Sequence, residues 1–157
     1  MIIGKRSIRG FSLIELMIAV LILGVLVLVA YPSYTDHVMS TKRQKAMADL
    51  LALANAMETY KAQSYSYGGA GANGADTGAP TIFNSWSPAD EPSANKAYNL
   101  TIKKIGDNGR TYELLATPLS TENMSKDGKL LYRSDGAKAW DSNNDGTFAS
   151  SEYCWQC

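Results

Sequence analysis

Cysteine and histidine are scarce in this chain of 157 residues, which holds two cysteines and one histidine. The cysteines, Cys154 and Cys157, stand together at the C-terminal end, far from His37. A zinc site needs more ligands than these, and a thioredoxin-like pair normally opens a helix inside a βαβ unit that this sequence lacks. A catalytic triad would depend on His37 alone, and no glycine-rich phosphate loop precedes a helix. The sequence therefore argues against an enzyme.

A net charge is also absent, because 15 Lys and Arg residues balance 15 Asp and Glu residues. A protein whose main task is to grip DNA phosphates needs a clustered basic face. Basic side chains do follow one another in the C-terminal half, at Lys103, Lys104, Arg110, Lys126, Lys129, Arg133 and Lys138. Acids interleave with them, so DNA binding stays open but is not favoured.

Charge is missing above all from residues 11–31, where Glu15 is the only charged side chain. About 20 apolar residues at 1.5 Å each cover the roughly 30 Å of a bilayer's hydrocarbon core. Lys5, Arg6 and Arg9 precede this run without an acid, which favours a single pass with a cytoplasmic N-terminus. A carboxylate inside the membrane costs roughly 2 to 3 kcal/mol at its centre, so Glu15 is expected to have a function.

The segment Gly10-Phe11-Ser12-Leu13-Ile14-Glu15-Leu16 resembles the prepilin motif of type IV pilins and pseudopilins. A secretory signal or a plain anchor is the alternative, but Ala30-Tyr31-Pro32 is a poor signal cleavage site. The resemblance implies that a prepilin peptidase cuts after Gly10 and that Phe11 is N-methylated. It further implies that Glu15 neutralises the amino terminus of a neighbouring pilin subunit during assembly, first in the inner membrane and then in an extracellular pilus fibre.

Periodicity beyond the apolar run predicts the rest of the fold. Residues 1–10 are the expected leader, 11–63 a long helix whose residues 11–31 cross the membrane, and 64–97 a Gly-, Ala- and Ser-rich loop. A helical stripe at Ala46, Leu50, Leu53, Met57 and Tyr60 predicts one buried face. Pro32 predicts a kink or local melting between Gly24 and Pro32, within a helix that continues beyond it.

Residues 98–157 read as an antiparallel sheet followed by a polar loop. Alternation predicts one hairpin from Tyr98 to Ala116 around the turn 106–109, and a second pair at Lys129–Arg133 and Ala137–Trp140. Four strands with one apolar face against the helix give an α+β fold. Together with Tyr31-Pro32-Ser33-Tyr34 and Cys154-Trp155, this pattern resembles minor pilins of the PilE type, which implies the ladle-like pilin fold.

The segment 141–152 fits the calcium-loop pattern D-x-[DN]-x-[DN]-G-x5-E at every fixed position. The expected oxygen ligands are the side chains of Asp141, Asn143, Asp145 and Glu152 and the carbonyl of Thr147. A turn of Asn, Asp and Gly residues with solvated acids is the alternative. The helix pair of a complete EF-hand is missing, so Ca²⁺ is expected in an isolated, structural loop.

The two cysteines are expected on the oxidising side of the membrane, where Cys154 and Cys157 would form a local disulfide. Such a bridge closes a very small ring and removes little chain entropy. The pilin resemblance implies a long-range disulfide in many relatives, for which residues 125–128 here offer no cysteine. The hypothesis is therefore that calcium holds this region together instead.

The function that these features predict is that of a structural type IV pilus subunit, a minor pilin, that polymerises through its apolar helix and supports pilus assembly, twitching motility and adhesion. Two alternatives stay open. One is a pseudopilin of a type II secretion system, and the other is a pilus subunit that binds DNA during uptake.

Overall fold

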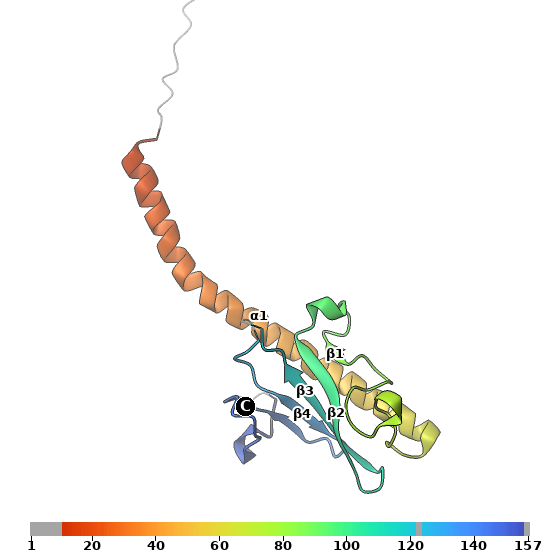
Figure 1. Cartoon of the computed structure of the whole chain (residues 1–157). Coiled ribbons are helices and arrows are strands. Elements are labelled where there is room, and N and C mark those ends of the chain that lie inside the picture. The colour runs from red at the N-terminus through yellow and green to blue at the C-terminus, as the bar shows by residue number, and fades with distance from the viewer. Residues whose placement is uncertain (1–10, 122–123, 156–157) are drawn as a thin grey trace, which may run out of the picture. The chain divides into compact units, whose positions relative to one another are not determined.

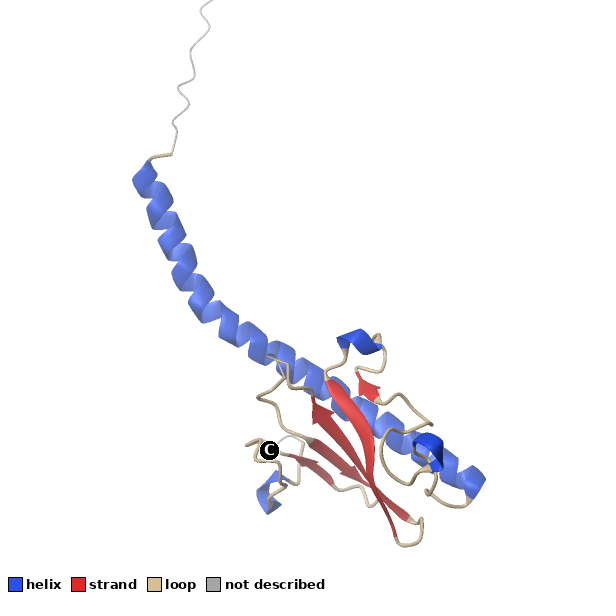
Figure 2. Ribbon diagram, in the orientation of Figure 1, coloured by secondary structure: helices blue, strands red, loops and turns tan. Residues whose placement is uncertain are grey.

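The computed structural model describes residues 11–121 and 124–155 of the chain. Its elements are α1 (Leu13–Ser64), β1 (Trp86–Ser87), β2 (Tyr98–Gly106), β3 (Thr111–Pro118), β4 (Leu130–Arg133) and β5 (Lys138–Trp140), with short 3-10 turns at Ala72–Gly74, Ser93–Asn95 and Ser150–Glu152 (Figure 2). The chain divides into two compact units, Met1–His37 and Val38–Cys157, and α1 runs through both. Each unit is described by itself, and the expected leader lies outside the described residues.

Within the first unit the apolar run is helical from Leu13 onward. The helix α1 thus begins two residues later than predicted, and it continues past Pro32 as expected. Local melting, one of the two outcomes expected between Gly24 and Pro32, does not occur, because α1 is unbroken there. A proline removes one backbone donor from the helix. The hydroxyl of Thr35 donates to the carbonyl of Pro32 at 2.8 Å within the same helix.

The sheet of the second unit is antiparallel and has five strands in the order β1-β2-β3-β4-β5. The four predicted strands are all present as β2 to β5, so the α+β prediction is confirmed. The prediction of only four strands is wrong, since Trp86 and Ser87 pair with Asn99 and Tyr98 at the edge of the sheet. Two residues are too few for alternation to reveal a strand, which explains why the segment reads as loop.

The core of this unit lies between the second part of α1 and one face of the sheet (Figure 1). The predicted helical stripe is confirmed: Ala46, Leu50, Leu53 and Met57 are fully buried, and Tyr60 packs at the edge of the core. Alternate residues of the strands complete it, namely Tyr98, Leu100, Ile102, Tyr112, Leu114, Ala116 and Leu130. Helix period and strand period therefore meet in one apolar layer.

The segment between α1 and β1 is mostly loop, as predicted, and it is fastened to the sheet. Gly78 exchanges backbone hydrogen bonds with Ile102 of β2 at 2.9 and 2.8 Å, and Tyr67 and Ala70 are buried in the core. These contacts give the loop backbone partners and apolar cover, so it forms part of the globular unit.

Candidate functional site

Ser12 and Glu15 close the first turn of α1 through two reciprocal hydrogen bonds. The backbone N–H of Ser12 donates to Glu15 Oε2 at 2.9 Å, and the N–H of Glu15 donates to Ser12 Oγ at 3.2 Å. This capping box satisfies donors that the start of a helix leaves free. It also holds the Glu15 carboxylate within one turn of Phe11, the residue expected to become the amino terminus. Gly10, the expected cleavage position, lies outside the described residues.

The helix that follows Glu15 exposes an apolar surface on every side. Each large apolar side chain between Leu13 and Leu28 is more than half exposed within this single chain. Among the described residues, α1 is the one helix long and apolar enough to cross a membrane. So much exposed apolar surface needs lipid or partner helices to cover it.

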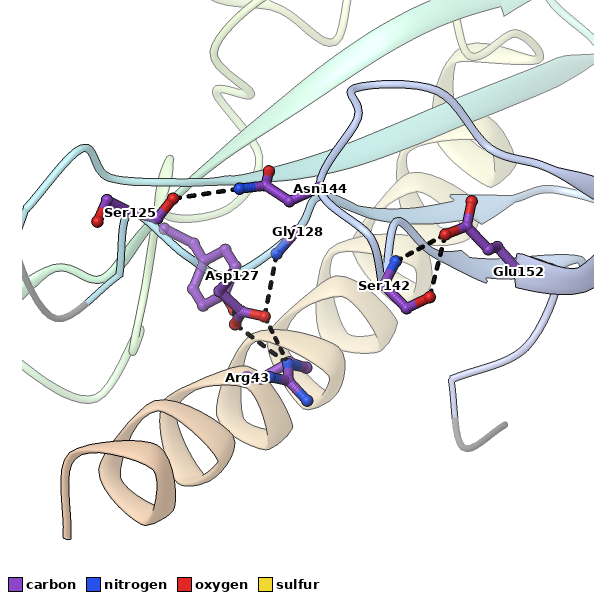
Figure 3. Close-up of polar contacts among 8 residues, drawn as sticks. Arg43, Ser125, Asp127, Gly128, Ser142, Asn144 and Glu152 are labelled. Carbon is purple, nitrogen blue, oxygen red and sulfur yellow. Dashed lines mark hydrogen bonds and ion pairs between the residues drawn. The ribbon is translucent and has the colours of Figure 1, made fainter. Parts of the chain in front are cut away.

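A buried ion pair joins α1 to the segment between β3 and β4. Arg43 Nε donates to both carboxylate oxygens of Asp127, at 2.8 and 3.1 Å, and Figure 3 shows the two side chains facing each other. Asp127 is 2 % exposed and also accepts hydrogen bonds from the hydroxyl of Tyr98 and from the N–H of Gly128. Burial, followed by the hydrogen bond to Asp127, raises the pKa of Tyr98. The Arg43 guanidinium also lies over the ring of Trp140, 3.9 Å from its centre.

A second polar group lies near the end of α1, where the exposed Glu58 meets the buried Tyr67 and Tyr112. Glu58 accepts hydrogen bonds from the hydroxyls of Tyr67 at 2.8 Å and Tyr112 at 3.2 Å. Burial, together with the neighbouring Glu58 carboxylate, raises the pKa of Tyr67 to about 12. Neither this group nor the Arg43–Asp127 pair was identified from the sequence. For Arg43 a signal exists, since it stands three residues before Ala46 and therefore lies on the buried stripe.

The predicted calcium loop is closed by hydrogen bonds of its own carboxylates. Asp141, which is fully buried, accepts the N–H groups of Asp145 at 3.0 Å and Gly146 at 2.9 Å. Gly146 has a φ of +87°, so the sharp turn predicted there is present. Glu152, 5 % exposed, accepts from Ser142 with one oxygen (Figure 3). Its other oxygen accepts from the N–H of Ala149. These donors, the Ala149 N–H first, lower the pKa of Glu152.

The predicted ligand set does not fit a calcium ion in this arrangement. Residues 11–121 and 124–155 contain no group of three or more His, Cys, Asp or Glu side chains that could hold a metal ion. Asp141, Asp145 and Glu152 all belong to these residues, and both Glu152 oxygens face backbone donors where bidentate coordination would need them turned toward a cation. Asn143 and Thr147 are exposed. Calcium binding therefore stays a prediction that rests on the sequence pattern.

The C-terminal end packs through Trp155. Its indole N–H donates to the carbonyl of Ala139 at 3.1 Å, and its ring lies 6.0 Å from that of Tyr132. Cys154 is described, but Cys157 lies outside the described residues. The local disulfide between them therefore stays a prediction.

The basic side chains of the sheet region differ in how they are paired. Lys103 forms a 3.0 Å ion pair with Glu113, and Arg133 a 3.4 Å pair with Asp135. Within the part of the chain that the structure describes, no ion pair with an acid forms at Lys104, Arg110, Lys126, Lys129 or Lys138. Lys129 lines a small cleft of about 170 Å³, together with Pro118, Ser125 and Asn144.

Comparisons with known protein families bear on both parts of the chain. A family model described as "Type IV minor pilin ComP, DNA uptake sequence receptor" matches residues 32–129. The model of the prokaryotic N-terminal methylation motif matches residues 5–31, which contain Gly10, Phe11 and Glu15. The first match covers α1 from Pro32 and the sheet as far as Lys129.

Relatives of known type are similar over different shares of the chain. Type II secretion system core protein G of Aeromonas hydrophila is 29% identical over 114 residues, which are 71% of this chain and 76% of that protein. Its counterpart in Escherichia coli strain K12 is 37% identical over 59 residues, so the match spans 38% of this chain and 41% of the relative. A fimbrial protein of Pseudomonas aeruginosa is 43% identical over 51 residues, 32% of this chain and 33% of that protein. No solved structure matches.

Proposed function

The chain belongs to the family of type IV minor pilins, and from this premise we propose that it enters a pilus through its N-terminal helix after processing in the inner membrane. A prepilin peptidase cuts after Gly10, Phe11 becomes the methylated first residue, and the N-terminus starts on the cytoplasmic side. The observation that carries this proposal is the helix of Leu13–Leu28, whose large apolar side chains are all more than half exposed. In the membrane lipid covers that surface, and in the fibre the helices of other pilin subunits cover it.

Glu15 selects the correct depth of a new subunit in the growing fibre. Two opposite charges attract strongly when water is excluded, whereas a single buried charge is costly. The capping box keeps the Glu15 carboxylate at the helix end, where the amino terminus of a neighbouring subunit can reach it. The globular unit then lies on the outside of the fibre and serves pilus assembly, twitching motility and adhesion.

Mass spectrometry of filaments sheared from cells tests this proposal. Wild-type chain is expected in the filaments with an N-terminal peptide that begins at methylated Phe11. Glu15→Gln should still be cleaved but enter filaments poorly, whereas Asp36→Asn, a matched change on the exposed helix beyond the apolar run, should enter normally. Normal entry of the Glu15 variant would refute its role in assembly.

The same preparation separates a pilus subunit from a secretion pseudopilin, the alternative that the secretion-system relatives favour. A minor pilin is expected in small amounts beside another pilin. If the chain is missing from sheared pili while its deletion blocks secretion of a substrate, the pseudopilin alternative replaces the proposal. Replacement of Gly10 by a bulky residue should block cleavage and leave the longer precursor in the membrane, and an unchanged mature mass would remove the leader assignment.

DNA binding during uptake is a second candidate function. The description of the matching family model names a DNA uptake sequence receptor. Five basic side chains of the sheet region, Lys104 and Lys129 among them, form no ion pair with an acid within the described ranges. Such side chains are available for phosphate contacts, which give DNA affinity its dependence on salt.

Binding of duplex DNA by the full-length chain at a series of salt concentrations tests this candidate. If Lys126 and Lys129 contact phosphates, replacing both by alanine should lower the slope of log affinity against log salt by about 2. Lys45→Ala is the control, because Lys45 of α1 already forms an ion pair with Glu91 at 2.9 Å. An unchanged slope in the double variant, or an equal change in the control, would reject these two lysines as the DNA contacts.

A further inference from the structure

The segment Asp141–Glu152 carries the full calcium-loop pattern, yet its last residue is oriented for another task. Glu152 Oε1 accepts the N–H of Ser142 at 2.9 Å, the hydroxyl of Ser142 at 3.0 Å and the N–H of Asn143 at 3.4 Å. Glu152 Oε2 accepts the N–H of Ala149 at 3.0 Å. A glutamate at the twelfth position of a calcium loop would present both oxygens to the cation. Here both oxygens are directed to the beginning and the end of the loop's own backbone.

The other carboxylates of the loop are used in the same way. Asp141 receives one backbone N–H on each oxygen, from Asp145 and from Gly146. Asp145 Oδ1 accepts both the N–H and the hydroxyl of Thr147, at 2.8 and 2.7 Å, and its Oδ2 accepts the side-chain amide of Asn143 at 3.0 Å. Each of these carboxylates therefore accepts hydrogen bonds from the loop's own donors.

We propose that Glu152 is a latch that closes the Asp141–Glu152 loop on its own backbone, and that the loop keeps its closed form without a bound cation. The latch brings together Ser142 and Ala149, the two sides of the turn. The Glu152 side chain itself is buried, at 5 % exposure. This inference concerns the globular unit and does not depend on the pilus function.

Closure of the loop has a consequence for the neighbouring segment. Asn144, with a φ of +55°, stands between residues held by Glu152 and by Asp141, and its side-chain amide donates to the carbonyl of Ser125 at 3.1 Å (Figure 3). Ser125 precedes Asp127 by two residues. The latch therefore holds Asn144 against the segment that carries the buried Asp127.

Amide hydrogen exchange of the full-length chain in detergent, read at residue resolution in EDTA and in 1 mM Ca²⁺, tests the latch. In EDTA the amides of Ser142, Asn143 and Ala149 should be protected, and calcium should change their exchange rates less than about twofold. Glu152→Gln should speed the exchange at one side of the loop by about tenfold or more, because glutamine keeps one acceptor oxygen and turns its NH2 group toward the N–H donor on the other side. Glu152→Asp should do the same, since its shorter side chain cannot reach both sides of the loop.

Asp145→Asn is the matched control, because it also removes one negative charge from the loop and changes one of the predicted calcium ligands. An asparagine at 145 can still accept from Thr147, so the three amides should keep their protection within about twofold. Two results would overturn the proposal. One is the absence of protection at these amides in EDTA for the wild type. The other is protection that appears only with calcium and is lost equally in Asp145→Asn and Glu152→Gln, which would establish the calcium site of the sequence pattern.

Discussion

Removing the Asp127 carboxylate should destabilise the globular unit more than any other single loss of charge considered for it. The Asp127 side chain is 1 % exposed and pairs with Arg43 at 2.8 Å. It also accepts a hydrogen bond from the hydroxyl of Tyr98, which is fully buried. Breaking a buried ion pair on one side costs roughly 3 to 5 kcal/mol, because the other charge stays behind. Arg43 is 16% exposed and can recover some hydration, which favours the lower end, about 3 kcal/mol. The unsatisfied Tyr98 hydroxyl adds about 1 kcal/mol.

Asp127→Ala is therefore expected to lower the free energy of unfolding by about 4 kcal/mol. For a unit of about 120 residues this corresponds to a Tm lower by roughly 12 to 16 °C. The assay is urea unfolding of the full-length chain in detergent, followed by near-ultraviolet circular dichroism. Glu91→Ala is the control, because the Lys45–Glu91 pair is 41%/37% exposed. An exposed pair of this kind contributes at most about 1 kcal/mol.

A compensating pair of changes separates lost charge from lost packing. Replacing both partners, as in Arg43→Met with Asp127→Leu, leaves no uncompensated charge and should recover most of the loss. The reasoning is refuted if Asp127→Ala unfolds within about 1 kcal/mol of the wild type, or if the double variant is as unstable as the two single losses added together.

Three further predictions concern the core, the tyrosines and one glycine. Leu50→Ala should cost about 2 to 5 kcal/mol in urea unfolding, because Leu50 is fully buried, whereas the same change at the 36% exposed Leu51 should cost under about 1 kcal/mol. Folding raises the pKa of Tyr67 from 10.0 to about 12, so the free energy of unfolding falls as the pH rises from 10 to 12. Tyr67→Phe should reduce that fall by roughly 2 to 3 kcal/mol when unfolding is measured at pH 9 and at pH 12. Gly128→Ala should give little folded protein by circular dichroism, because its Cβ would lie 1.5 Å from the carbonyl oxygen of Asp141, and near-normal folding would contradict this.

The parts of the fold that follow from periodicity could be predicted from the sequence. The stripe that contains Leu50 and the alternation from Tyr98 to Ile102 each repeat long enough to define a buried face, and both faces meet in the core. Pro32 shows the limit of a local rule. The rule predicts a disrupted helix, but a single missing donor does not end a helix of 52 residues.

The polar interactions could not be predicted in the same way, because their partners are distant in sequence. Arg43 and Asp127 are separated by 84 positions, and no short motif records such a pair. In the Asp141–Glu152 loop a motif is present, but it specifies residue types and not the direction in which a side chain turns. A carboxylate that can coordinate a cation can equally accept backbone N–H groups, and only the arrangement of the backbone decides between them.

The way in which the C-terminal half is held together follows from these contacts. The predicted Cys154–Cys157 bridge would close a ring too small to restrict the chain, so a covalent link cannot fix the segment between β3 and β4. Arg43 holds this segment from the side of α1, and Asn144 holds it from the side of the Asp141–Glu152 loop. The two contacts differ in what they require: the first depends on a buried charge pair, and the second on the latch at Glu152. Loss of the latch should therefore release Ser125 while Asp127 stays in place, whereas loss of Arg43 should loosen Asp127 while Asn144 still holds Ser125.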